Sequence, residues 1–159
     1  MSSQAPSRPI EPDRFASSRE REAARSERET APIEAQAIAP VTDSFSLLDH
    51  RTRSRAIAPR LAPRGPYLSL HDGERTWLLS LEDKITHLGR GLGSEVRFED
   101  QRVSRSHAII VRHGRYARVL DNRSSHGTFL NGRRIVATNI KDGDVIALGP
   151  VEMRYVEVG

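Results

Sequence analysis

Residues 67–81 read YLSLHDGERTWLLSL and predict two β-strands joined by a tight turn. Apolar residues dominate the runs Tyr67–His71 and Arg75–Leu81, and Asp72-Gly73 lies between them. An Asp-Gly pair between two apolar-rich runs is a strong short-range signal for a β-hairpin, because glycine adopts the positive φ that such a turn needs. This stretch therefore predicts the start of an antiparallel sheet.

The same pattern continues to the end of the chain. The pairs His113-Gly114, Asn131-Gly132 and Asp142-Gly143 are turn signals that follow or separate short apolar runs. These runs are 85–88, 96–98, 107–112, 116–120, 128–130, 145–148 and 151–158. About ten to eleven short strands, without a helical pattern after residue 66, predict an all-β fold, an antiparallel β-sandwich over residues 66–159.

Residues 1–65 have a different composition. Eight of the nine prolines lie within residues 1–66, whereas ten of the eleven glycines lie at or beyond Gly73. The first 65 residues carry 11 arginines and 9 acidic residues and few large apolar side chains. Such a segment buries too little apolar surface to offset its ordering entropy. We therefore expect residues 1–65 to form a disordered Arg/Pro/Ala-rich tail, with at most a transient helix over residues 17–29.

Charge and apolar runs restrict the cellular setting. The 159 residues carry a net charge of only +4, and the longest purely apolar runs have four residues, Ala108–Val111 and Val145–Leu148. A membrane-spanning helix needs about 20 apolar residues. The absence of cysteine excludes disulfides and fits a reducing compartment. The sequence predicts a cytoplasmic protein with no membrane partner.

Enzyme and cofactor motifs are not found in the sequence. Gly89-x-Gly91-x-Gly93 lacks the third glycine at the spacing of a dinucleotide loop, and no Gly-x-x-x-x-Gly-Lys or Gly-x-Ser-x-Gly sequence occurs. The six histidines are scattered without metal-ligand spacing. We expect no enzymatic activity, no cofactor and no metal.

Three polar loops carry the residues that are suited to binding a ligand. They are LGRGLGS at 88–94, VSRSH at 103–107 and DNRSSHGTFLNG at 121–132. A phosphate dianion is bound by an arginine fork together with short donors at fixed positions. Arg90 can supply the fork, Ser104 and Ser125 can donate hydroxyl hydrogens, and backbone N–H groups near Arg105 can complete the cradle.

Together these blocks resemble the forkhead-associated (FHA) family. The family's ordered motifs are matched by Gly89-Arg90, by Ser104-Arg105-Ser106-His107 and by Asp121 through Gly132, and the late turn by 142–149. The resemblance covers about residues 66–158. It implies a β-sandwich that binds phosphothreonine peptides reversibly, through loops at one end, in Ser/Thr-kinase signalling.

The resemblance also implies individual roles. Arg90 and Ser104 occupy the main phosphate-contacting positions, and Ser125 and Arg105 occupy further contact positions. His107 fills the position that bonds between loops, supported by Gly89 and Gly127. His126 stands where the family has an asparagine that bonds the peptide backbone, so the peptide preference of this chain is open.

The tail supplies candidate ligands for such a module. Thr30 and Thr42 are candidate phosphosites, and their third following residues, Ile33 and Phe45, are of a type that FHA domains read. A tethered phosphothreonine has a high effective concentration. We expect a Ser/Thr protein kinase as a partner and self-inhibition by the phosphorylated tail.

Binding of nucleic acid or an acidic surface is the alternative. Residues 51–64 hold five arginines and no acidic residue, a composition that attracts polyanions. The whole tail carries a net charge of only +2, no aromatic residues interleave in the tract, and no reading helix is evident. This function therefore ranks second.

Overall fold

The computed structural model describes residues 43–159. The proposed helix over 17–29, Thr30 and Thr42 lie outside the described residues. The elements, in chain order, are α2 (His50–Ser54), the 3-10 helix η2 (Pro59–Leu61), β1 (Gly65–Asp72), β2 (Arg75–Ser80), β3 (Ile85–Gly89), β4 (Val96–Arg97), β5 (Ala108–His113), β6 (Tyr116–Asp121), β7 (Thr128–Leu130), β8 (Arg133–Ile135), β9 (Ala137–Ile140), β10 (Val145–Leu148) and β11 (Val151–Val158).

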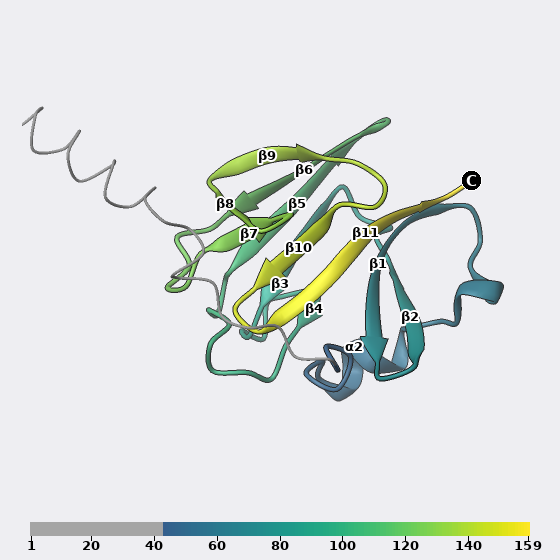
Figure 1. The fold of residues 1–159 in the computed structure, drawn as a ribbon, viewed down its shortest axis with the longest axis horizontal. Helices are drawn as coiled ribbons and strands as arrows, with labels where there is room; N and C mark the ends of the chain where they lie inside the picture. Colours follow the sequence, from purple (N-terminus) through teal and green to yellow (C-terminus); the bar gives the residue numbers. More distant parts are fainter. Residues whose placement is uncertain (1–42) are drawn as a thin grey trace, which may run out of the picture. The chain divides into compact units, whose positions relative to one another are not determined.

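The eleven strands within residues 43–159 form two sheets (Figure 1). One sheet has the order β2-β1-β11-β10-β7-β8, and the other has the order β4-β3-β5-β6-β9. The predicted all-β sandwich is confirmed. Among these strands β3 and β4 form a parallel pair, with Leu88 opposite Val96, and the remaining assigned pairs are antiparallel.

The two predicted hairpins form at the expected glycines. The β1–β2 ladder ends at the pair Asp72 and Arg75, and Gly73 takes a φ of +54°. The β5–β6 ladder ends at the pair His113 and Tyr116, and Gly114 takes a φ of +58°. A side chain with a Cβ rarely adopts this left-handed region, so the glycines determine where both strands reverse.

Alternating side chains build the core between the sheets. Along β11, Val151, Met153 and Tyr155 are buried, while Glu152 and Arg154 are exposed. This period of two is the geometry of a strand with one face on a core. The fully buried large side chains are Leu48, Leu68, Leu70, Leu79, Leu81, Leu88, Phe98, Ile110, Ile146, Leu148, Met153 and Tyr155.

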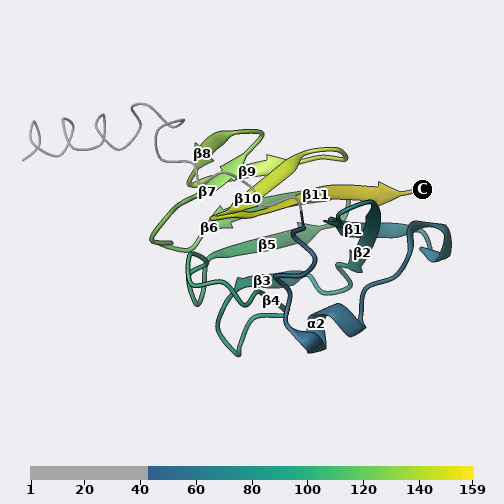
Figure 2. The ribbon, with the colours of Figure 1, turned by 60° about the horizontal axis from the view of Figure 1, so that its bottom comes forward.

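The folded body begins before residue 66, which corrects the predicted tail boundary. Leu48 is fully buried in the core and forms a β-bridge with Phe98, and Ile57 forms a bridge with Leu78. Helix α2 follows Leu48 and lies beside β4 (Figure 2). The Asp49 N–H donates to the Arg97 carbonyl oxygen at 3.0 Å. Leu48 lies in the core, and Phe45 and Leu47 pack against it, so these three apolar residues anchor the segment. The average composition of residues 1–65 is polar and does not reveal these few apolar residues.

Within residues 43–159, no helix has the length and apolar character required to span a bilayer.

Candidate functional site

Three loops of the sandwich converge at one site. The β3–β4 loop binds the β4–β5 loop through two backbone hydrogen bonds, from Arg90 N to Ser104 O at 3.0 Å and from Gly91 N to Arg105 O at 2.9 Å. The β6–β7 loop joins them where the Ser125 N–H donates to Ser104 Oγ at 3.0 Å. The predicted site residues from three separated motifs therefore lie together.

Gly89 allows the first two loops to approach closely. A Cβ at this position would lie 2.3 Å from the Arg105 carbonyl oxygen and 2.9 Å from that of Ser104. Both contacts are with backbone, which cannot rotate away as a long side chain can. The glycine is required here because only a residue without a side chain fits between the loops.

His107 ties the loops together from inside the fold. Its side chain is fully buried, and Nδ1 accepts a hydrogen bond from the Ser104 N–H at 3.0 Å. Since Nδ1 accepts, Nε2 carries the proton and donates to the Gly127 carbonyl oxygen at 2.8 Å. Burial lowers the pKa of His107, against the hydrogen bond to Gly127 and the charge of Asp121. The ring is thus held neutral as a bridge between the second and third loops.

Gly127 lies on the third loop at the other end of this bridge. It takes a φ of +84°, and a Cβ there would lie 2.8 Å from Nε of Arg134. Asp121 shapes the same loop, because its carboxylate accepts hydrogen bonds from Ser124 and from the buried Thr128 hydroxyl at 2.7 Å. Sequence reasoning placed Asp121 in the motif but did not assign this role to it.

The Arg90 side chain is held at Nε, whereas its two terminal nitrogens are available to a ligand. Its Nε donates to the Val103 carbonyl oxygen at 3.2 Å, and the side chain is half-buried. Within residues 43–159, no hydrogen bond engages its two terminal nitrogens. These nitrogens are the fork that a planar, bidentate contact with an anion uses.

Ser104 contributes a hydroxyl beside that fork. Its Oγ accepts from the Ser125 N–H, so the hydroxyl hydrogen is available for a ligand. Arg105, Ser125 and His126 are exposed at the rim. Among the described residues, no hydrogen bond engages the His126 ring.

Arg97 is a supporting residue that the sequence reasoning missed. Its Nε donates to the Arg90 carbonyl oxygen at 2.9 Å, and its Nη1 lies 3.5 Å from Asp49 Oδ2. Its backbone N–H donates to the buried Thr52 hydroxyl at 3.2 Å. One guanidinium therefore links the segment before β1 to the loop that carries Arg90.

Asp49 completes this link from α2. It is the N-cap of the helix, where its Oδ1 accepts the Thr52 N–H at 2.8 Å. Although burial alone would raise it, hydrogen bonds from Thr52 and Arg97 lower the pKa of Asp49 on balance. A capping aspartate directly after Leu47-Leu48 is the sequence signal that would have found it.

Comparison with known proteins identifies the family. The FHA domain model matches residues 86–149. A solved structure described as a structural and functional analysis of phosphothreonine-dependent FHA domain interactions is 34% identical, with a TM-score of 0.53. The alignment covers 59% of this chain and 97% of that one. The chain belongs to the FHA family.

A second solved FHA domain agrees with this assignment. It is that of FhaA, crystallised with the intracellular domain of Rv3910, and is 35% identical with a TM-score of 0.53. The alignment covers 57% of this chain and 99% of that one.

The curated relatives of this FHA protein are much longer. FhaA of Mycobacterium tuberculosis is 38% identical over 87 residues, which are 54% of this chain and 16% of FhaA. The ABC transporter ATP-binding/permease protein Rv1747 of the same organism is 33% identical over 70 residues, which are 44% of this chain and 8% of the transporter. The chain thus spans less than a fifth of either relative.

Proposed function

We propose that this protein binds phosphothreonine peptides reversibly through the three loops, with Arg90 and Ser104 as the main phosphate contacts. The observation that carries the proposal is the geometry of Arg90. Its Nε is fixed on Val103, its terminal nitrogens are free within the described residues, and the Ser104 hydroxyl is held on a neighbouring loop. Phosphothreonine-dependent interaction of a similar FHA domain supports it.

The expected affinity follows from the number of contacts. A hydrogen bond to a charged group contributes about 1.5–3 kcal/mol. Three or four such bonds, less the cost of association, give a Kd on the order of micromolar. Without the phosphate Arg90 has no counter-charge, so the unmodified peptide binds far more weakly. Such affinities suit a module that binds its partner reversibly after a Ser/Thr kinase has phosphorylated it. We expect the module and the kinase to act in the cytoplasm.

The rim residues tune this recognition. Arg105 and Ser125 are exposed beside Ser104 and can contact the phosphate or the peptide. His126 can donate from a ring nitrogen to a peptide carbonyl, as a replacement for an asparagine amide. The histidine ring is wider than an amide, so we expect a peptide preference that differs from that of relatives with asparagine.

The tail threonines differ as ligands. If Thr42 were bound, Phe45 would be the third following residue. Phe45 is instead stacked on Trp77 with ring centroids 5.1 Å apart, and its N–H donates to the His71 carbonyl at 2.9 Å. Reading Phe45 would require this contact to break. We therefore propose phosphorylated Thr30, followed by Ile33, as the self-inhibitory ligand.

Isothermal titration with matched variants tests the site. A phosphothreonine peptide selected from a library is titrated into the wild type, Arg90→Ala, Ser104→Ala and Arg115→Ala. Arg115 is exposed at the β5–β6 turn, so its variant removes the same charge away from the loops. We expect at least tenfold weaker binding for the Arg90 and Ser104 variants and wild-type binding for Arg115→Ala. Equal losses in all three variants would refute the assigned site.

A further inference from the structure

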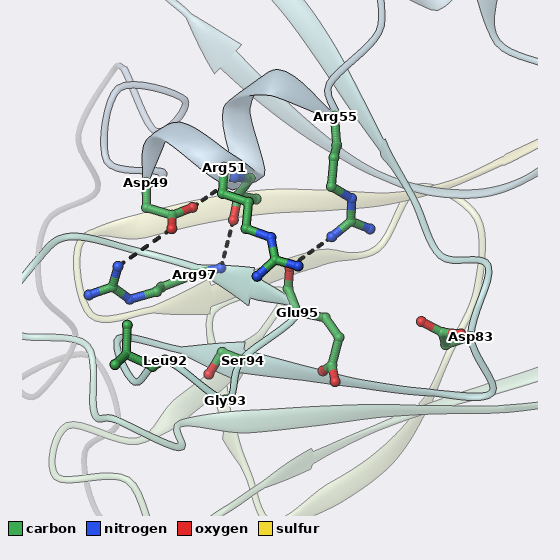
Figure 3. A pocket seen from close by; sticks show the side chains of 10 residues that line it. Asp49, Arg51, Arg55, Asp83, Leu92, Gly93, Ser94, Glu95 and Arg97 are labelled. Carbon is green, nitrogen blue, oxygen red and sulfur yellow. Dashed lines mark hydrogen bonds and ion pairs between the residues drawn. The ribbon is translucent and has the colours of Figure 1, made fainter.

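A polar pocket of about 460 Å³ lies between the segment around α2 and the β3–β4 loop (Figure 3). Its lining residues come from the helix region on one side and from the β3–β4 loop and β4 on the other, together with Asp83 of the β2–β3 connection. The charged residues among them are Asp49, Arg51, Arg55, Asp83, Glu95 and Arg97. The helix side lies outside residues 86–149, which the FHA family model matches.

Two of the three carboxylates of the pocket are engaged within the fold. Asp49 pairs with Arg97 at 3.5 Å. Glu95 Oε2 accepts from the His87 N–H at 2.5 Å and contacts His87 Nδ1 at 3.0 Å. Burial alone would raise the pKa of Glu95, but the hydrogen bonds it accepts, those from His87 among them, lower it on balance. Asp83, on the β2–β3 connection, is exposed.

Among residues 43–159, Arg51 and Arg55 have no carboxylate partner. They are four residues apart and share one side of α2 and its C-cap. Arg55 Nη1 donates to the backbone oxygen of Glu95 at 3.0 Å, and no hydrogen bond or ion pair engages the Arg51 guanidinium within residues 43–159. Figure 3 shows both guanidinium groups extending from the helix toward Glu95. Like charges at this spacing repel, so a bound anion would stabilise the pair.

The pocket adjoins the phosphate-binding loop. Leu92, Gly93 and Ser94 line it and follow Arg90 on the same loop. Arg97 forms part of the pocket wall and at the same time donates to the Arg90 carbonyl. An extended chain advances about 3.3 Å per residue, so a residue a few positions from a phosphothreonine held at Arg90 is within reach of the pocket.

We propose that Arg51 and Arg55 form a second anion subsite that binds an acidic side chain or a second phosphate of the same peptide. This inference rests on the proposed phosphothreonine binding and deepens it. The subsite would select partners with an acidic residue at a defined distance from the phosphothreonine. Each guanidinium would gain the carboxylate or phosphate oxygen that the fold does not provide.

The distribution of the other arginines favours a peptide over nucleic acid. Arg53 is exposed, but its guanidinium is held by the chain itself, because its Nε donates to the Leu48 carbonyl oxygen at 2.9 Å. Arg60 and Arg64 are exposed but do not line the pocket. The five arginines of residues 51–64 thus do not form one continuous basic surface. Of these five, only Arg51 and Arg55 line the pocket.

A glutamate scan tests the subsite. One phosphothreonine peptide with neutral flanks is compared with versions that carry a single glutamate, or a single phosphoserine, moved along the peptide one position at a time. Binding is measured for the full chain, for the R51Q/R55Q variant and for the R60Q/R64Q variant, which removes the same charge outside the pocket. Duplex DNA is titrated in parallel.

We expect the wild type to gain roughly three- to tenfold in affinity when the glutamate or phosphoserine occupies one or two adjacent positions. R51Q/R55Q should lose this gain while it binds the neutral phosphopeptide as the wild type does, which also shows that it is folded. R60Q/R64Q should keep the gain.

Three results would overturn the inference while phosphopeptide binding stands. They are no gain at any position, a gain that survives in R51Q/R55Q, and an equal loss in R60Q/R64Q. If R51Q/R55Q lost affinity for duplex DNA but kept the gain with the acidic peptides, the inference would also be overturned. The two arginines would then bind nucleic acid. If the neutral phosphopeptide binds no better than its unphosphorylated form, the proposed function fails and the inference fails with it.

Discussion

The guanidinium of Arg97 donates from Nε to the carbonyl oxygen of Arg90 at 2.9 Å. The same group lies 3.5 Å from the carboxylate of Asp49, at the start of α2. The segment before β1 is thereby connected to the loop that carries Arg90, the proposed phosphate contact. The folding of this segment and the position of Arg90 in the candidate site should therefore depend on each other.

Asp49 provides the first test of this connection. Asp49→Ala removes the cap of α2 and the partner of Arg97, so we expect a loss of about 1–2 kcal/mol in the free energy of unfolding. The phosphopeptide affinity should fall severalfold although Arg90 is unchanged. Urea unfolding and titration measure the two effects. Asp49→Asn keeps an oxygen for the cap and should lose less stability; equal stability of both variants with the wild type would contradict this role.

Leu48 tests where the folded body begins. Its side chain is fully buried, so Leu48→Ala should lower the free energy of unfolding by about 2–5 kcal/mol. Leu61, which is 66% exposed, is the matched control, and Leu61→Ala should change stability by less than about 0.5 kcal/mol. Chemical denaturation measures both. Similar small effects would mean that the segment before β1 does not belong to the core.

Gly89 tests the close approach of the loops. In Gly89→Ala the new Cβ would meet the Arg105 carbonyl at 2.3 Å, so the first two loops must separate. We expect phosphopeptide binding to fall at least tenfold. Gly93 lies on the same loop with nothing within 4 Å of a Cβ, so Gly93→Ala should bind a phosphothreonine peptide with neutral flanks, which does not use the proposed second subsite, as the wild type does. A Gly89→Ala protein with wild-type affinity would be inconsistent with the described geometry.

His107 should make stability depend on pH. Burial lowers its pKa in the folded state, so the unfolded chain binds the proton more readily, with an ordinary value near ~6.5. Stability contributed by the neutral ring is present above that value and is lost as pH falls below it. The free energy of unfolding, measured from pH 8 to pH 5 for the wild type and His107→Gln, should fall more steeply for the wild type. Parallel curves would show that His107 is not held neutral.

The sequence predicted those features that depend on neighbouring residues. Asp72-Gly73 and His113-Gly114 mark their hairpins because the turn and both strands are contiguous. The motif positions in the three loops were recognised from a family resemblance, and the sandwich brings Arg90, Ser104 and Ser125 together.

The missed features depend on long-range contacts. Arg97 meets Asp49 and Thr52 across 48 and 45 positions, and a single sequence carries no record of such pairings. The average composition of residues 1–65 is polar, and this average hides single apolar side chains such as Leu48, which is fully buried. The position of Phe45 against Trp77 could be known only from the fold.

The central claim is that the phosphate decides binding. The most direct measurement is the Kd of the full chain for one phosphothreonine peptide and for the same peptide with unmodified threonine, by isothermal titration. The account predicts a Kd on the order of micromolar for the phosphopeptide and a Kd at least a hundredfold weaker, roughly millimolar, for the unmodified form. Equal affinity for the two peptides would contradict it.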